Sequence, residues 1–260
     1  NSTGRFLMFS NLMEKSVIDD VIELFIPYWC RDPDTLIVIS HGSGGIGSAE
    51  KSIAQKFITE GYNVALLDYF TKHGIDSLGW IDHGPFMDRH AVSFAEMFDI
   101  NLPKYKNIIH IGFSLGGYFG LYHSQKFIKN YCFYPGIIAV TDELIKKDYS
   151  NTTVFLPTND TWCTNYGLFR DMCGNPPNDF VINDCYHGFM LRHKEREILI
   201  TKYNTTQRIL SNKEFGQLRP NHYTFALLFP GFHNEKIRLQ SNKKYSIMCL
   251  NYILEDINNI

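Results

Sequence analysis

The chain has 260 residues and a formal net charge of −2, and 44% of its residues are hydrophobic. This length and composition suit one α/β domain with a sizeable core, so we expect a single domain over residues 1–260. The lack of a basic run argues against nucleic acid as a partner, and no stretch approaches the ~20 apolar residues that cross a bilayer. We expect a soluble protein, cytoplasmic or, if a leader has been removed ahead of Asn1, periplasmic or secreted.

The hydrophobic pattern alternates between strands and helices along the chain. Strands are predicted at 35–40, 63–67, 107–111, 130–134, 153–157 and 179–183. Helices are predicted at 48–61, 86–98, 115–127 and 243–257. Apolar runs bounded by glycine suit parallel strands that are covered on both faces. The order therefore predicts an α/β fold with a mostly parallel sheet and helices on both of its faces.

A glycine-rich turn follows the first of these strands, with the sequence HGSGG at 41–45. Such a turn leaves backbone N–H groups that can point at a developing oxyanion, and Ser43 and Gly44 carry the candidate groups. A phosphate-binding loop or a plain tight turn is the alternative. We favour the oxyanion interpretation because the lysine of a phosphate-cradling loop is missing.

A serine lies at a predicted strand-to-helix turn, in the sequence GFSLGG at 112–117. This is the pattern of a nucleophile elbow, in which the flanking glycines remove Cβ atoms that would collide and the serine Oγ is pushed outward. Ser114 is the candidate nucleophile. The N–H of Leu115, the next residue, is a second candidate donor to an oxyanion.

An aspartate and a histidine follow two later strands of the predicted sheet. Asp160 comes after the strand at 153–157, and His187 comes after the strand at 179–183. Ligand sites of such sheets lie at the carboxyl ends of the strands, and serine, aspartate, histidine is the chain order of α/β-hydrolases. The alternatives are Asp171 and Asp184 for the acid and His193, His222 and His233 for the base.

With these residues the chain resembles the dienelactone hydrolase family of α/β-hydrolases. The similarity covers about residues 17–190 and rests on HGSGG at 41–45, GY at 61–62 leading to LDYF at 67–70, GFSLGG at 112–117, DTW at 160–162 and YHGF at 186–189. The resemblance implies the α/β-hydrolase fold, with Ser114 as nucleophile, Asp160 as acid and His187 as base. The family's namesake enzymes use cysteine as nucleophile, so a serine at 114 favours a more general carboxylic ester over dienelactone.

The function that follows is hydrolysis of a small-molecule ester or lactone through an acyl-enzyme, without a metal or organic cofactor. A thioesterase, a peptidase or an acyltransferase would use the same three residues. A non-catalytic binding protein that has kept the fold is the alternative from another class.

Several other residues are weaker candidates. Near predicted loops, an acyl pocket could be lined by Trp80, Phe86, Tyr118 and Trp162, and Arg89 could pair with a substrate carboxylate. The polar cluster of Asp82, His83, Asp88, Arg89 and His90 has spacings that do not put metal ligands on one helical face, so we expect no metal there.

Residues 192–242 form a long insertion between the His187 loop and the closing helix, and strand-like pieces occur at 197–203 and 206–210. Long connections next to an active site are typical of lids and binding loops, so we expect this segment to cover the acyl pocket. The alternatives are an extra packed layer and an interface in a homodimer. Cys163 and Cys185 flank the acid and base, and a disulfide between them is a further hypothesis for an oxidising compartment.

Overall fold

The computed structural model describes residues 13–18, 22–71, 102, 104–137, 140–161, 166–190, 196–203 and 232–260. Within these residues, eight strands form one sheet in the order β1-β2-β4-β3-β5-β6-β7-β8. Their bounds are β1 Met13–Ile18, β2 Ile22–Pro27, β3 Thr35–Ser40, β4 Asn63–Leu67, β5 Asn107–Phe113, β6 Lys129–Phe133, β7 Thr152–Pro157 and β8 Asn178–Ile182. The six predicted strands are confirmed, whereas β1 and β2 were not predicted.

The strands from β4 to β8 run parallel, and β2 joins β4 antiparallel at the other end of the sheet. In the register of β3 and β5, Ser40 pairs with Gly112, and Phe113 at the end of β5 pairs with Phe133 of β6. The carboxyl ends of β3, β5 and β6 are therefore level with one another. This brings the loops that follow these strands to one edge of the sheet.

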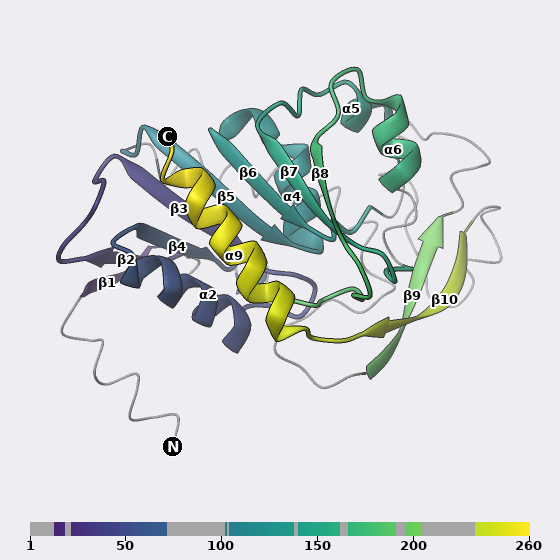
Figure 1. Ribbon diagram of the computed structural model, residues 1–260, viewed down its shortest axis with the longest axis horizontal. Helices are drawn as coiled ribbons and strands as arrows, with labels where there is room; N and C mark the ends of the chain where they lie inside the picture. The colour runs from purple at the N-terminus through teal and green to yellow at the C-terminus, as the bar shows by residue number, and fades with distance from the viewer. Residues whose placement is uncertain are drawn as a thin grey trace.

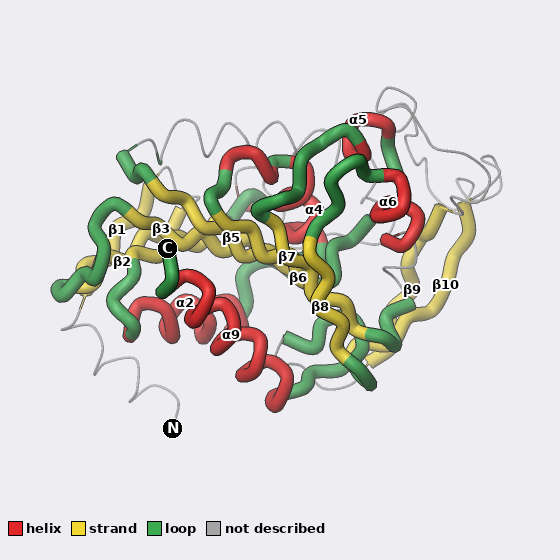
Figure 2. Tube along the Cα trace, turned by 45° about the horizontal axis from the view of Figure 1, so that its top comes forward, coloured by secondary structure: helices red, strands yellow, loops and turns green. Residues whose placement is uncertain are grey.

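Helices cover both faces of the sheet. In Figure 1, α2 (Ser48–Thr59) and α9 (Lys243–Ile257) lie in front of it and α4 (Leu115–Tyr122) lies behind. Figure 2 shows α2 and α9 on one side of the strands and α4, α5 (Asp142–Ile145) and α6 (Tyr166–Met172) on the other. None of the described helices is long and apolar enough to cross a membrane. The prediction of an α/β fold with helices on both faces is confirmed.

Local chemistry explains where the helices end. After α2, Gly61 takes a φ of 87°, a left-handed conformation in which glycine has no Cβ penalty. The helix predicted at 115–127 is shorter: α4 ends at Tyr122, and a 3₁₀ turn over Ser124–Lys126 follows. The helix predicted at 86–98 lies outside the described residues.

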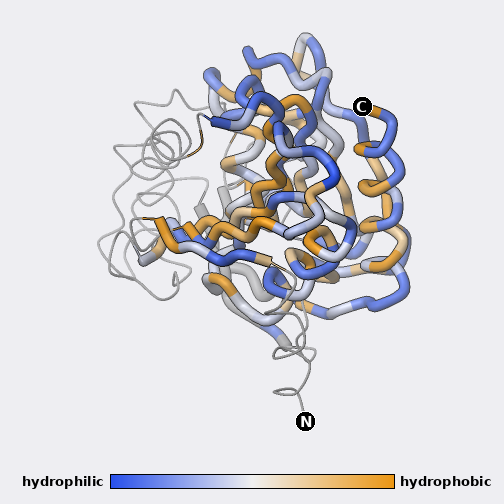
Figure 3. Tube along the Cα trace, turned by 90° about the vertical axis from the view of Figure 1, so that its left-hand side faces the viewer, coloured by the Kyte–Doolittle hydropathy of each residue, from blue (hydrophilic) through white to orange (hydrophobic). Residues whose placement is uncertain are grey.

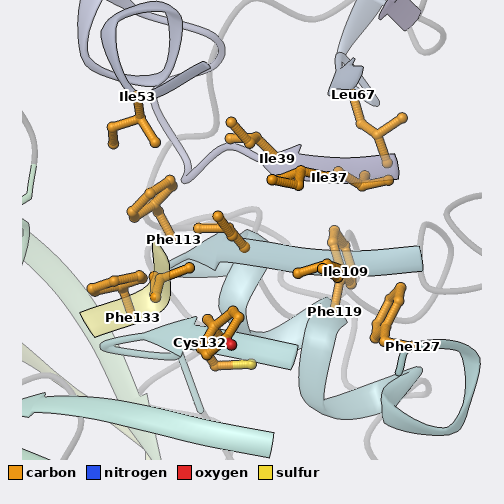
Figure 4. Packing of buried hydrophobic residues seen from close by; sticks show 14 of the residues in the cluster. Ile37, Ile39, Ile53, Leu67, Ile109, Phe113, Phe119, Phe127, Cys132 and Phe133 are labelled. Atoms are coloured by element: carbon orange, nitrogen blue, oxygen red, sulfur yellow. The ribbon is translucent and has the colours of Figure 1, made fainter. Parts of the chain in front are cut away.

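The core lies on both faces of the central strands. Every residue of β3 and β4 is buried, as expected for parallel strands between helix layers. Figure 3 shows hydrophobic segments in the interior of the molecule and more hydrophilic loops around them. In Figure 4, Ile39 of β3, Phe113 of β5 and Phe133 of β6 lie on neighbouring strands of this core.

A separate antiparallel ribbon is formed by β9 (Arg196–Tyr203) and β10 (Phe232–Leu239). It lies beyond β8, at the right of Figure 1. The strand predicted at 197–203 is confirmed, β10 was not predicted, and the piece at 206–210 lies outside the described residues. Leu239, the last residue of β10, forms a parallel bridge with His187. The chain therefore returns from the long insertion to the loop that carries the candidate base.

Candidate active site

Ser114 lies between the end of β5 and the start of α4, and its backbone is strained. Its φ of 52° and ψ of −106° put a non-glycine residue in a sparsely populated region. Two hydrogen bonds hold this peptide in place: Ser114 N–H donates to the Phe133 carbonyl at 2.9 Å, and Gly136 N–H donates to the Ser114 carbonyl at 2.9 Å. The turn is thus fixed by the loop that follows β6.

The two glycines of the elbow are required by close packing. A Cβ on Gly112 would overlap with the carbonyl oxygen of Gly116, and a Cβ on Gly116 would overlap with the carbonyl oxygen of Ser40. Gly116 N–H also donates to the His41 carbonyl at 3.0 Å. The helix α4 therefore packs directly on the end of β3, which sets the distance between the serine turn and the glycine-rich turn.

The structure brings Ser114, His187 and Asp160 together in a line of hydrogen bonds. His187 Nε2 lies 2.9 Å from Ser114 Oγ, and His187 Nδ1 lies 2.8 Å from Asp160 Oδ2. The side chains of His187 and Asp160 are 4% and 1% exposed. A carboxylate accepts the Nδ1 proton, so the neutral ring has a lone pair on Nε2 to accept the serine hydroxyl proton.

The loops after β7 and β8 hold the aspartate and the histidine side by side. Asp160 N–H donates to the Pro157 carbonyl at 3.1 Å, closing a turn at the end of β7. Asn159 N–H donates to the Cys185 carbonyl at 2.9 Å and ties this turn to the His187 loop. Because the two loops leave adjacent parallel strands, residues that are 27 positions apart meet.

The alternatives for the acid lie elsewhere. Asp171, on α6, and Asp184, in the turn after β8, are both exposed, and Asp184 has a φ of 56°. Among the alternatives for the base, His193 and His222 lie outside the described residues, and His233 is a residue of β10. Of the residues weighed from the sequence, Asp160 and His187 are those that the structure joins to Ser114.

The glycine-rich turn lies against the serine. A Cβ on Gly42 would be 3.4 Å from Ser114 Cβ, so the turn passes directly over the elbow. The Gly42 carbonyl accepts from His41 Nδ1 at 2.7 Å and from Gly45 N–H at 3.2 Å. In a trans peptide the C=O and the next N–H point in opposite directions, so Ser43 N–H points away from both of these donors. Leu115 begins α4, and its N–H has no acceptor within the helix.

Residues 42–47, GSGGIG, also match the spacing G-x-G-x-x-G of dinucleotide-binding turns. The contact between Gly42 and Ser114 nevertheless favours the oxyanion interpretation, because it aims this turn at the elbow. Of the two candidate residues, Gly44 is exposed and a Cβ there would meet no atom within 4 Å. Ser43 is next to Gly42 in the chain, so its N–H is better placed than that of Gly44 to donate to an oxyanion at Ser114.

His41 supports this turn, a role that the sequence did not indicate. Its ring is fully buried and stacks on Tyr69 with ring centroids 3.9 Å apart, and the Tyr69 hydroxyl donates to the His41 carbonyl. Burial lowers the pKa of His41 to about 4, against smaller opposing effects of the Gly42 carbonyl and Asp68. The ring is therefore neutral near pH 7 and donates its Nδ1 proton to Gly42.

Tyr134 is a second residue that the sequence analysis missed. It follows β6, is fully buried, and has a φ of 37°, which is strained for a bulky side chain. Its ring meets the His187 ring edge-on, with centroids 4.7 Å apart. An aromatic residue just after a strand gives no signal of such a contact, because the contact depends on a loop from another part of the chain.

The remaining candidates are not part of this cluster. Tyr118 lies on α4 in the hydrophobic core and is 4% exposed. Cys185 is a buried free thiol, and Cys163 lies outside the described residues. No group of three or more potential metal ligands occurs among the residues that the structure describes. Outside that part of the chain lie Trp80, Phe86, Arg89, Trp162 and the cluster from Asp82 to His90.

Comparison with solved structures gives the class of the fold. A dienelactone hydrolase-like promiscuous phosphotriesterase from metagenomic libraries matches with a TM-score of 0.57 and 11% identity, covering 95% of this chain and 96% of that one. A dienelactone hydrolase from Anabaena variabilis matches with a TM-score of 0.49 and 13% identity over 70% of this chain and 90% of that one. No protein-family model matches the sequence, and a search of curated proteins found no match.

The chain therefore has the α/β-hydrolase fold. Its eight-stranded, mostly parallel sheet and covering helices are those of this fold, and the dienelactone hydrolase-like protein that it matches with a TM-score of 0.57 covers nearly the whole chain. At 11% identity the likeness to the phosphotriesterase establishes the fold, and the chemistry has to be argued from the site.

Proposed function

We propose that this protein is a serine hydrolase that cleaves a carboxylic ester or lactone through an acyl-enzyme, with Ser114 as nucleophile, His187 as base and Asp160 as the orienting acid. The observation that carries the proposal is the unbroken line of hydrogen bonds from Ser114 Oγ through His187 to Asp160, at 2.9 and 2.8 Å. A serine hydroxyl is a weak nucleophile, and a base within hydrogen-bond reach activates it.

In the first half of the reaction, Ser114 Oγ attacks the carbonyl carbon while His187 Nε2 takes the hydroxyl proton. The carbonyl π electrons move onto the oxygen, which accepts hydrogen bonds from the N–H groups of Leu115 and Ser43. When this intermediate collapses, the bond to the alcohol oxygen breaks and the imidazolium gives its proton to that oxygen. The acyl group stays on Ser114.

In the second half, water replaces the alcohol. His187 takes a proton from the water as it attacks the acyl carbon, and the bond to Ser114 Oγ then breaks with return of that proton to the serine. Throughout, Asp160 holds the ring with Nδ1 protonated and stabilises the transient imidazolium, which matters because both side chains are buried. No step in this sequence calls for a cofactor.

The experiment is a panel of 4-nitrophenyl esters, lactones, thioesters, amides and a phosphotriester, assayed with the wild-type protein and with Ser114→Ala. We expect ester or lactone turnover that Ser114→Ala abolishes, and a fluorophosphonate probe that labels Ser114 alone. Labelling that persists in Ser114→Ala would refute the nucleophile. Selective turnover of thioesters or amides would change the substrate class, and a folded protein inert to probe and panel would favour the non-catalytic alternative.

A further inference from the structure

The loop after β6 brings a glycine to the nucleophile. Gly136 N–H donates to the Ser114 carbonyl at 2.9 Å. A Cβ built on Gly136 would lie 3.6 Å from Ser114 Oγ and 3.7 Å from the Leu115 nitrogen. The missing side chain therefore leaves space beside both the atom that would attack the substrate and a candidate oxyanion donor.

This glycine is not explained by the backbone. The described glycines with positive φ are Gly45, Gly61 and Gly188, so Gly136 has a conformation open to other residues. Outside the two residues next to it in the chain, the nearest atom to its Cβ would be Ser114 C at 3.5 Å, an ordinary van der Waals distance. Gly112 and Gly116 are different, because a Cβ on either would overlap with a carbonyl oxygen.

The space beside Gly136 belongs to the acyl side of the reaction. Apart from Gly136 itself and the two residues next to it in the chain, the three atoms nearest to its Cβ would be Ser114 C, Ser114 Oγ and Leu115 N, which all belong to the elbow and not to His187. The departing alcohol has to lie at His187 Nε2, which protonates it. The group that remains attached to Ser114 Oγ therefore faces Gly136.

We infer that Gly136 determines acyl specificity, by leaving room for acyl groups that are branched at the carbon next to the carbonyl. The inference rests on the proposed function, because it concerns the acyl-enzyme formed on Ser114. A methyl group on residue 136 would occupy the volume that such a branch needs, while an acetyl group would still fit. Residue 136 should therefore affect which acyl groups the enzyme accepts, and it should not affect which alcohols it accepts.

The test compares 4-nitrophenyl acetate, 2-methylpropanoate and 2,2-dimethylpropanoate, together with acetates of alcohols of increasing size. The variants are Gly136→Ala and Gly136→Val. Gly174→Ala is the matched control, because Gly174 is exposed at the opposite end of the strands and a Cβ there would meet no atom within 4 Å. Thermal unfolding reports whether each variant is folded.

A methyl group that does not fit its pocket lowers kcat/KM by about 10- to 200-fold. Because we expect the branched acyl groups to fit, the wild-type kcat/KM for their esters should be within about tenfold of the value for the acetate. Gly136→Ala should lower the ratio of branched ester to acetate at least tenfold and Gly136→Val further, whereas Gly174→Ala leaves it unchanged. The alcohol series should keep its order in every variant.

Two results would overturn the inference without touching the proposed function. One is Ser114-dependent turnover in Gly136→Ala with the same acyl preference as wild type. A changed order of rates among the acetates of different alcohols, with the acyl preference unchanged, would count in the same way. The other is a wild-type protein that rejects branched acyl esters, a result that stands even if the Gly136 variants fail to fold. Loss of the proposed function looks different, because no ester would then be turned over in a Ser114-dependent way.

Discussion

At the scale of single residues, the most informative group is the carboxylate at the end of the line of hydrogen bonds, beyond His187 as seen from Ser114. Asp160 is 1% exposed at its side chain and accepts the Nδ1 proton of His187 at 2.8 Å. A buried carboxylate in this place sets the ring tautomer, and in the proposed mechanism it stabilises the imidazolium that forms during attack. Neither effect requires the acid to gain a proton.

Asp160→Asn should lower kcat by about 10³- to 10⁴-fold with little change in KM, because the amide can donate to Nδ1 and favour the wrong tautomer. Steady-state kinetics on the best ester of the panel measures this. Asp171→Asn and Asp184→Asn are the matched controls, since both side chains are exposed. If kcat fell in Asp184→Asn and stayed unchanged in Asp160→Asn, the acid would be Asp184, and the assignment of Asp160 would be wrong.

At the scale of elements, the site depends on how closely α4 approaches β3. Gly116 allows this approach, because its Cα lies against the carbonyls of Ser40 and His41 at the end of β3. The same contact holds the glycine-rich turn over Ser114, through the hydrogen bond from Gly116 N–H to His41. The close packing of α4 on β3 therefore also determines the geometry of the candidate oxyanion site.

Gly116→Ala should destabilise the fold by about 1–3 kcal/mol and also slow the reaction, because the added methyl pushes α4 away from β3. Denaturant unfolding gives the free energy, and the rate of fluorophosphonate labelling reports the geometry of Ser114. Gly167→Ala on α6 is the control, since its Cβ would meet nothing within 4 Å. Full stability in Gly116→Ala would mean that the helix has more freedom than its contacts imply.

The ribbon of β9 and β10 is the second element that touches the site. Its end pairs with His187 through Leu239, and Arg238 stacks over the Tyr186 ring at 4.7 Å. These contacts connect the insertion at 192–242 to the base loop. That the insertion covers the acyl pocket stays a prediction, because residues 204–231 lie outside the described part of the chain.

At the scale of the whole molecule, a buried histidine links the sheet to α4. His110 Nδ1 donates to Asn130 Oδ1 at 2.8 Å, and His110 Nε2 accepts from the Ser40 hydroxyl at 2.9 Å. Asn130 in turn donates to the Gly120 carbonyl of α4 at 2.9 Å. Burial lowers the pKa of His110 to about 4, an effect that the hydrogen bond to Asn130 opposes.

A lowered histidine pKa makes stability depend on pH. Between the unfolded pKa of about 6.5 and the folded pKa of about 4, the unfolded chain binds the extra proton, so the free energy of unfolding falls as pH falls through this window. From pH 7 to pH 5 this amounts to about 2 kcal/mol. His41, whose pKa is also about 4, adds a similar dependence.

His110→Asn keeps a donor toward Asn130 and cannot titrate, so its loss of unfolding free energy from pH 7 to pH 5 should be smaller than that of wild type by about 2 kcal/mol. Urea titrations of both proteins at the two pH values measure the difference. Equal losses in both would mean that His110 is already able to take up a proton in the folded state.

Much of this organisation could be read from residue patterns. The strands β3 and β4 and the helix α9 have their predicted bounds, because long apolar runs and helical periodicity are local signals that tertiary packing did not override. The serine turn was recognisable for the same reason, since its glycines are needed by contacts that any such turn makes. The edge strand β1 was not predicted because its sequence, MEKSVI, has no strong apolar run, and none of its residues is buried.

Contacts between distant segments could not be read in this way. Three aspartates were open for the acid, and the pairing of β7 with β8 brings Asp160 to His187 while Asp171 and Asp184 remain exposed. The roles of Tyr134 and Gly136 could be recognised only from the tertiary structure, in which the loop after β6 packs against the elbow and His187. Local sequence identifies the residues that can carry out the chemistry. Their positions relative to one another depend on the order of the parallel strands in the sheet, because this order decides which loops meet at the carboxyl edge, and no single segment encodes it.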